Sequence, residues 1–211
     1  MAIADLSLSA FGIPTPVRSA LVAALWIALT GGLHVDGVID TADGLAVPDR
    51  DRRLIVMTDS RMGAFGGMAV VILLLLKVVA LTYLLERTSI ARTFGLIAVC
   101  SWGRWGQQWA IARYPYLKEK GKGAFHKAAL PAISNTLPSA LTIILISLIS
   151  AFSGIIPISL AIRTTAGGLI LSWLSSAYFA RQLGGHTGDT YGAVVEWTEA
   201  FLLCLLTAEF A

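Results

Sequence analysis

The chain has 211 residues, of which 56% are hydrophobic and 14% are charged, and its mean hydropathy is +0.74. Soluble domains carry about 25% charged residues, so this composition excludes an ordinary water-soluble domain. The net charge of +3 is too small to indicate a nucleic-acid partner. Length and composition together predict a single integral membrane domain, residues 1–211, folded as an all-α helical bundle.

Six stretches of the sequence are apolar enough to cross a bilayer, for which a helix needs about 20 mostly apolar residues. In chain order they lie at residues 17–33, 64–85, 90–112, 137–162, 165–180 and 191–210. The first and the fifth are short. Gly154 and Pro157 favour a break near the far end of the fourth.

The basic residues between these spans indicate the orientation of the chain. Ten of them fall in the loops at residues 34–63, 113–136 and 181–190, whereas four lie on the opposite side of the bundle. The positive-inside rule therefore places these three loops in the cytoplasm and both chain ends outside. Because the polar, glycine-rich segments fall in the same three loops, we expect these loops to form the active site.

The first such segment is GGLHVDGVIDTADG, residues 31–44, which contains three aspartates at positions i, i+4 and i+7. Asp36, Asp40 and Asp43 therefore share one face of any helix formed here. Like charges at this spacing repel one another, and carboxylate oxygens suit Mg²⁺ or Mn²⁺. The alternative is a solvated loop whose aspartates cap helices, but three aspartates on one face beside a span favour metal binding.

The second segment is TDSRMGAFGG, residues 58–67, directly before a long apolar run. Beside the aspartate cluster, Asp59 is a candidate metal ligand or base and Arg61 a candidate phosphate contact. The alternative is that Asp59 caps the following helix while Arg61 anchors it at the lipid headgroups.

Two basic features are candidates for binding an anion. Lys122 belongs to the loop YPYLKEKGKG, residues 114–123, which either contacts phosphate groups or only carries the positive-inside signal. Arg104 lies between two tryptophans inside an expected span, where a charge is costly and usually functional, so we favour an anion contact over snorkelling. Lys77 raises the same question with less support.

The last segment, LGGHTGDTYGAVVEWTE, spans residues 183–199. Gly185 and Gly188 let the backbone approach a ligand closely. Asp189 is either a further oxygen ligand or the N-cap of the last helix. Glu196 and Glu199 lie within an apolar helix, so both are expected to face the interior of the bundle.

These four segments occur in the order found in the cobalamin synthase family, the adenosylcobinamide-GDP ribazoletransferases, which the chain resembles over nearly its whole length. The resemblance implies that the 5′-hydroxyl of α-ribazole, or of its 5′-phosphate, is joined to adenosylcobinamide-GDP with release of GMP. It also implies dependence on Mg²⁺ and a place in a bacterial or archaeal cytoplasmic membrane, among membrane lipid. Homo-oligomers or other enzymes of cobalamin assembly are possible partners.

The resemblance also implies roles for particular residues. It assigns metal binding to Asp36, Asp40, Asp43, Asp59 and Asp189, and phosphate contact to Arg61, Arg104 and Lys122. Either Asp43 or Asp59 is expected to take the proton from the attacking hydroxyl. The chain departs from the family pattern at its start, because members usually carry an additional span before the GGLH motif, whereas only sixteen residues precede the first expected span here.

Two alternative functions use similar residues. A CDP-alcohol phosphotransferase of lipid synthesis also joins a hydroxyl to a pyrophosphate substrate, but its motif reads D-G-x-x-A-R where this chain has D-G-x-x-D-T at residues 36–41. A membrane transporter or cation channel would carry acidic residues deep in several spans. Here the aspartates lie in loops on one side, and only Glu196 and Glu199 fit that alternative.

Overall fold

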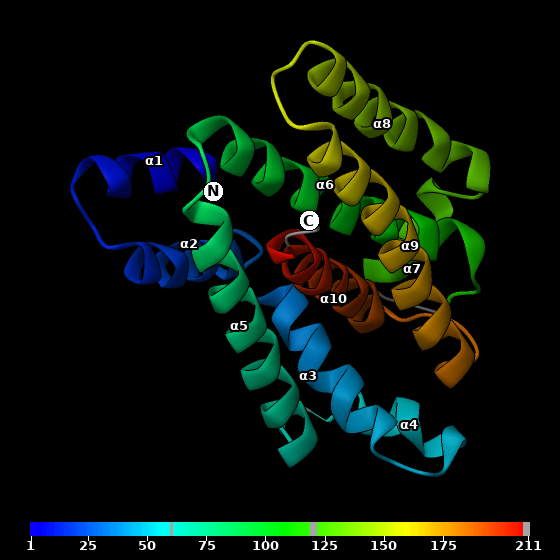
Figure 1. Cartoon of the computed structure of the whole chain (residues 1–211). Coiled ribbons are helices and arrows are strands. Elements are labelled where there is room, and N and C mark those ends of the chain that lie inside the picture. Colours follow the sequence, from blue (N-terminus) through cyan, green and yellow to red (C-terminus); the bar gives the residue numbers. More distant parts are fainter. Residues whose placement is uncertain (60, 119–121, 209–211) are drawn as a thin grey trace.

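The computed structural model describes residues 1–59, 61–118 and 122–208, apart from the side chain of Lys122. Over these residues the chain forms helices, joined by loops that contain one isolated parallel bridge between Tyr116 and His186 (Figure 1). The elements are α1 (Ala2–Ala10), α2 (Thr15–Leu29), α3 (Leu33–Leu45), α4 (Arg50–Val56), α5 (Ala64–Leu85), α6 (Ser89–Arg113), α7 (Lys122–Ala129), the 3-10 turn η1 (Ile133–Thr136), α8 (Leu137–Phe152), α9 (Ile158–Leu183) and α10 (Gly188–Thr207). The prediction of an all-α membrane bundle is confirmed.

A helix overlaps each expected span, but not all of these helices are equally suited to lipid. Within the described residues, α5, α8 with its preceding turn, and α9 are long and apolar enough to cross a membrane. The pair α2 and α3 qualifies as a fourth only if the two helices are counted as one bent span. Two expected boundaries were wrong: the fourth span ends at Phe152, and the fifth begins at Ile158 and runs for 26 residues. The break contains Gly154, at φ +69°, and Pro157, which precedes α9.

The chain turns sharply between α2 and α3, whose axes are bent by 87°. Gly31 and Gly32 lie at the turn with φ values of 62° and 74°, a left-handed conformation that side chains rarely adopt. The turn ends the apolar α2 and directs the polar α3 across the end of the bundle. This bend is what separates the aspartates from the membrane-spanning part of the chain.

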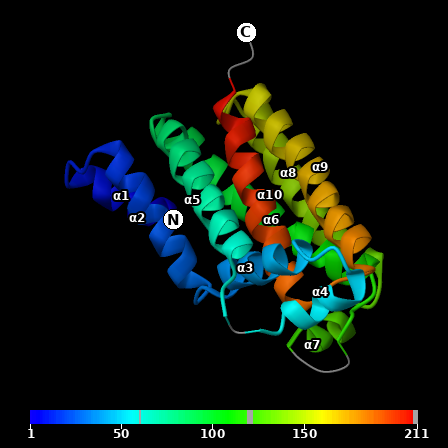
Figure 2. The same cartoon turned by 90° about the horizontal axis from the view of Figure 1, so that it is seen from below.

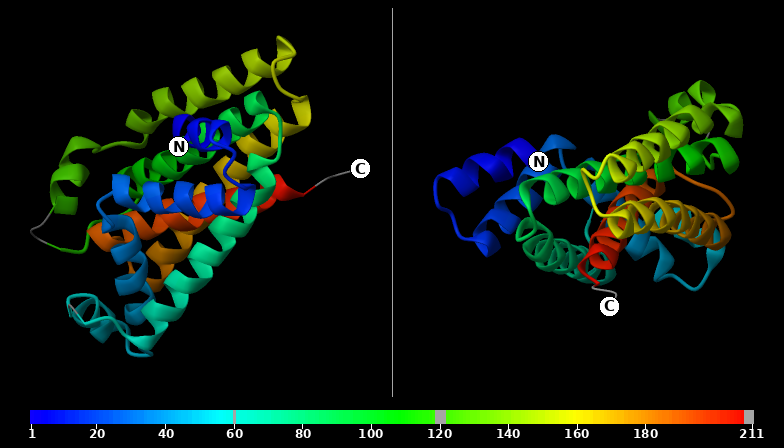
Figure 3. Two further views of the ribbon diagram at one scale, coloured as in Figure 1. Left: turned by 90° about the vertical axis from the view of Figure 1, so that its left-hand side faces the viewer. Right: turned by 45° about the horizontal axis from the view of Figure 1, so that its top comes forward.

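The long helices run side by side, and α3, α4 and α7 gather at one end of them (Figure 2). Helix α10 packs against α3, α5, α6 and α9, while α8 lies at the edge of the bundle against α9 and α6 (Figure 3). The buried core includes Trp102, Leu202 and Leu203. Small residues allow the close packing, because a Cβ at Gly168 would lie 2.2 Å from the Trp102 ring. The outer faces carry exposed apolar side chains such as Leu75 and Leu145, as expected for contact with lipid.

Candidate active site

Helix α3 carries Asp36, Asp40 and Asp43 at the end of the bundle where the polar loops meet (Figure 2). It packs closely against the start of α10, because a Cβ at Gly37 would lie only 2.3 Å from the backbone oxygen of Asp189. Glycine at this position therefore allows the two backbones to approach each other. The contact brings Asp189, another aspartate of the predicted set, close to α3, where its charge acts on Asp40.

Asp40 lies in a strongly negative environment. Burial, followed by the charges of Asp36 and Asp189, raises the pKa of Asp40 to about 6, and Asp43 adds to this effect. Lys118 lowers the pKa but does not cancel the increase. The negative charge of these aspartates is thus only partly balanced by the positive charge of Lys118, as expected of a site for a cation.

Asp43 has a structural role at the beginning of α5. Its Oδ2 accepts a hydrogen bond from the Gly63 backbone N–H at 2.7 Å, and its Oδ1 accepts one from Gly66 at 2.8 Å. These donors belong to the first turn of α5 and the residue before it, where helix N–H groups have no partner within the helix. Asp43 therefore joins α3 to α5 and holds the end of the segment that contains Asp59.

Asp189 is held between two loops that lie far apart in sequence. Its Oδ2 accepts hydrogen bonds from Lys118 Nζ at 3.0 Å and from Thr187 Oγ1 at 3.1 Å. The same loops are joined by backbone hydrogen bonds between residues 115–117 and 186. A Cβ at Gly185 would lie 2.6 Å from the Pro115 oxygen, so Gly185 serves loop packing, whereas nothing lies within 4 Å of the Cβ position at Gly188. Of the two predicted ligand-facing glycines, only Gly188 is open.

Asp59 and Arg61 pair with each other at the exposed start of α5. Arg61 Nη2 lies 2.7 Å from Asp59 Oδ2, and the hydrogen bonds from Arg61 lower the pKa of Asp59 to about 2. A carboxylate with so low a pKa is a weak base at neutral pH. The expected roles of both residues at the metal and phosphate remain predictions.

Arg104 is exposed and points toward the first turn of α3. Its Nη1 lies 2.9 Å from His34 Nε2 and 3.4 Å from Gln107 Oε1. Because a guanidinium only donates, His34 Nε2 acts as the acceptor. The third predicted phosphate contact, Lys122, begins α7, but its side chain lies outside the described residues.

A buried charge network lies behind the aspartates. Lys77 Nζ is 2.5 Å from Glu196 Oε2 and 2.8 Å from Glu199 Oε2, and all three side chains are buried. Glu196 Oε1 also lies 3.7 Å from His34 Nδ1, which connects the network to Arg104. The inward orientation of both glutamates is confirmed, but the sequence analysis did not pair them with Lys77. The sequence did contain a signal for this pairing, because Lys77 is a single cation in one apolar span and the two glutamates lie together in another.

The described residues contain no group of three or more His, Cys, Asp or Glu side chains close enough together to hold a metal ion directly. Mg²⁺ seldom needs such a group, because it keeps several waters and commonly binds one or two carboxylates together with substrate phosphates. The excess negative charge around Asp40 and the hard oxygen donors of Asp36 and Asp40 fit this mode of binding. Asp43 has fewer free lone pairs, since both its oxygens already accept hydrogen bonds.

Comparison with known proteins adds an independent finding. Residues 1–207 match the family described as cobalamin-5-phosphate synthase. The chain is similar to the adenosylcobinamide-GDP ribazoletransferase of Trichormus variabilis, with 51% identity over 203 residues that cover 96% of this chain and 79% of the relative. The enzyme of the same name from Thermosynechococcus vestitus is 52% identical over 195 residues, which cover 92% of this chain and 74% of the relative. No solved structure matches the chain.

Proposed function

The chain belongs to the cobalamin-5-phosphate synthase family, and we propose that it joins adenosylcobinamide-GDP to α-ribazole with Mg²⁺ held by the aspartates of α3. The transferase function agrees with the family and with the names of its relatives. The magnesium site is our inference. The observation that carries it is that Asp36 and Asp40 share one face of α3 next to the backbone of Asp189, where burial and then the charges of Asp36 and Asp189 raise the pKa of Asp40. We further propose that the aspartate end of the bundle faces the cytoplasm, as the distribution of basic residues favours.

In the proposed reaction the 5′-hydroxyl of α-ribazole attacks the phosphorus next to cobinamide. A new P–O bond forms, the P–O bond to the bridging oxygen breaks, and GMP leaves with the bonding electron pair. Bound Mg²⁺ would supply charge neutralisation for the pyrophosphate oxygens. Asp36 and Asp40 are the ligands that we assign to it, and Asp189 adds negative charge nearby. Positioning and electrostatic stabilisation account for most of the catalysis in such transfers.

The remaining polar residues have separate roles in this proposal. Arg104 is exposed next to α3 and contacts the phosphates, oriented by His34. The hydroxyl proton is predicted to go to Asp43 or Asp59. Both already accept hydrogen bonds, Asp43 from the start of α5 and Asp59 from Arg61, so either would have to exchange a partner before acting as a base.

A transfer assay in nanodiscs tests the proposal. Purified protein is incubated with adenosylcobinamide-GDP, α-ribazole and Mg²⁺, and the corrinoid product and GMP are measured by chromatography. We expect Asp40→Asn to lower the rate at least 100-fold, because it removes one metal ligand. Asp51→Asn, an exposed acidic change on the neighbouring α4, should retain the wild-type rate. Equal rates for Asp40→Asn and wild type across a Mg²⁺ titration would refute the assigned metal site.

A further inference from the structure

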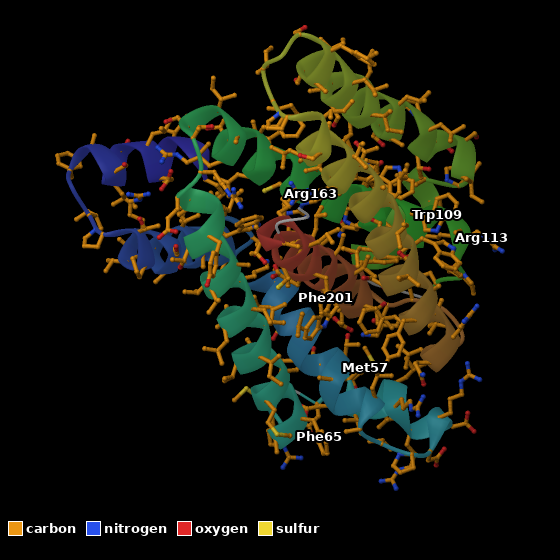
Figure 4. The ribbon with its side chains drawn as sticks, viewed as in Figure 1. Met57, Phe65, Trp109, Arg113, Arg163 and Phe201 are labelled. Carbon is orange, nitrogen blue, oxygen red and sulfur yellow. The ribbon has the colours of Figure 1, made fainter. Side chains whose placement is uncertain are left out.

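A deep groove lies on the side of α3 that faces away from the aspartates. It has a volume of about 680 Å³ and is bounded by α3, α5, α9 and α10. Its walls are almost entirely apolar and include the aromatic side chains of Phe65, Tyr178, Trp197 and Phe201. Figure 4 labels Phe65 at the start of α5 and Phe201 on α10. We call this cavity the α3 groove.

The α3 groove and the aspartates lie on opposite faces of one helix. The helix contributes Val38, Thr41, Ala42 and Leu45 to the groove. With about 100° between successive residues, these four positions point away from the face that carries residues 36, 40 and 43. Whatever fills the groove therefore supports α3 from the side opposite the proposed metal site.

The groove opens onto the surface that contacts lipid. Two of its lining residues, Phe65 and Tyr178, are more than half exposed. Exposed apolar residues continue the surface beyond the opening along two candidate spans, with Met68 on α5 and Trp173 on α9. The opening thus belongs to the same apolar surface that the bundle presents to the bilayer. Its volume is within the range of small-molecule sites.

One polar group in the groove has no partner. Thr41 is 2% exposed, and its hydroxyl forms no hydrogen bond with any of the described residues. The lining also contains the hydroxyl of Ser175, which already accepts a hydrogen bond from Thr198, and that of Tyr178, whose side chain is more than half exposed. A buried hydroxyl without a partner is costly, so the natural occupant is apolar along its length and carries one hydrogen-bond acceptor.

We propose that the α3 groove binds one acyl chain of a membrane phospholipid, whose ester carbonyl accepts a hydrogen bond from the Thr41 hydroxyl. An acyl chain matches the apolar walls and enters from the lipid-facing opening without crossing the bundle. The ester group supplies the single acceptor that Thr41 lacks. This inference rests on the membrane location of the chain and does not depend on the transferase reaction.

Native mass spectrometry of the full chain, released from vesicles of a diester phosphatidylcholine, tests the proposal. We expect wild-type protein to retain one phospholipid that Ala42→Phe, which fills the groove, does not retain. Thr41→Val keeps the side-chain shape and should weaken retention roughly two- to tenfold, the effect of one hydrogen bond. The controls are Ala24→Phe and Thr142→Val, at exposed positions on α2 and α8, and they should retain lipid as wild type does.

Replacing the ester lipid by its dialkyl ether analogue, which lacks the carbonyl, tests the assigned hydrogen bond. Wild-type protein should bind the ether analogue as weakly as Thr41→Val binds the ester lipid. Thr41→Val should bind the ether analogue no more weakly than it binds the ester lipid. Equal retention of both lipids by wild type would overturn the proposal, as would full retention by Ala42→Phe. Displacement of the lipid by α-ribazole, or recovery of a dimer that Ala42→Phe abolishes, would assign the groove to a different occupant and also overturn it.

Discussion

Removing the charge of Lys77 should strongly destabilise the bundle. Its ammonium group lies between Glu196 and Glu199, at 2.5 Å and 2.8 Å, and each of the three residues is at most 2% exposed. Lys77→Met keeps the length of the side chain but leaves two carboxylates close together and away from water. Removing one partner of a buried ion pair typically costs about 3–5 kcal/mol.

For a chain of this size, each kcal/mol lowers Tm by roughly 2–4 °C. We therefore expect Lys77→Met to lower Tm by about 6–20 °C in detergent, followed by circular dichroism. Neutralising all three groups, with Glu196→Gln and Glu199→Gln added, should recover most of the loss, because no buried charge then remains unpaired. Lys118→Met breaks a more exposed pair and should cost less than about 1 kcal/mol.

Two results would refute this reasoning. A Tm for Lys77→Met within about 2 °C of the wild-type value would mean that the two glutamates are stabilised without the lysine. A triple variant as unstable as the single one would mean that the loss comes from packing and not from charge. In either case, the ion pairs of Lys77 would not be what holds α5 against α10.

The remaining predictions concern α3. Gly37→Ala should lower both Tm and transfer activity, because the added Cβ would lie 2.3 Å from the Asp189 backbone oxygen, whereas Gly67→Ala meets only one side-chain atom at 3.9 Å and should be tolerated. Asp40→Asn should raise the stability of the metal-free protein at pH 7.5. The pKa of Asp40 in the folded chain is about 6, above its usual value of 3.8, so its ionised form opposes folding. The stability that protonated Asp40 provides is lost as pH rises from about 4 to about 6. The gain for Asp40→Asn, at most about 1–2 kcal/mol after solvent screening, should therefore disappear below pH 4, as thermal melts in EDTA would show.

The apolar runs predicted much of the fold, whereas the orientation read from the charge pattern stays a prediction. The span at residues 64–85 coincides with α5, because this run is apolar over nearly its whole length, Lys77 being the one charged residue, and is bounded by glycine and by glutamate. The boundary between α8 and α9 was wrong by about ten residues at the end of the fourth span, because apolar residues continue through the break. There, backbone geometry at Gly154 and Pro157 ends the helix while the hydropathy hardly changes.

At the site, local spacing predicted what lies on one helix and missed what depends on packing. Three aspartates at i, i+4 and i+7 do share a face of α3. The partners of Asp43 are backbone N–H groups, which no residue type in the sequence marks. The pairing of Lys118 with Asp189 joins loops about 70 residues apart, and it follows only once the loops are brought together by the bundle.

The two hydrogen bonds to Asp43 also close a loop in the chain. Residues 44–62 leave α3 and return to its end, where Gly63 and Gly66 are bound, so both ends of this segment are fixed by the same carboxylate. The entropy cost of closing such a loop grows only slowly with length, by about 0.6 kcal/mol for each doubling. Since the closure is made at Asp43, a change in the length of this segment should cost little in closure entropy. The hydrogen bonds that hold α3 against α5 at Asp43 therefore do not depend on the length of the loop between them.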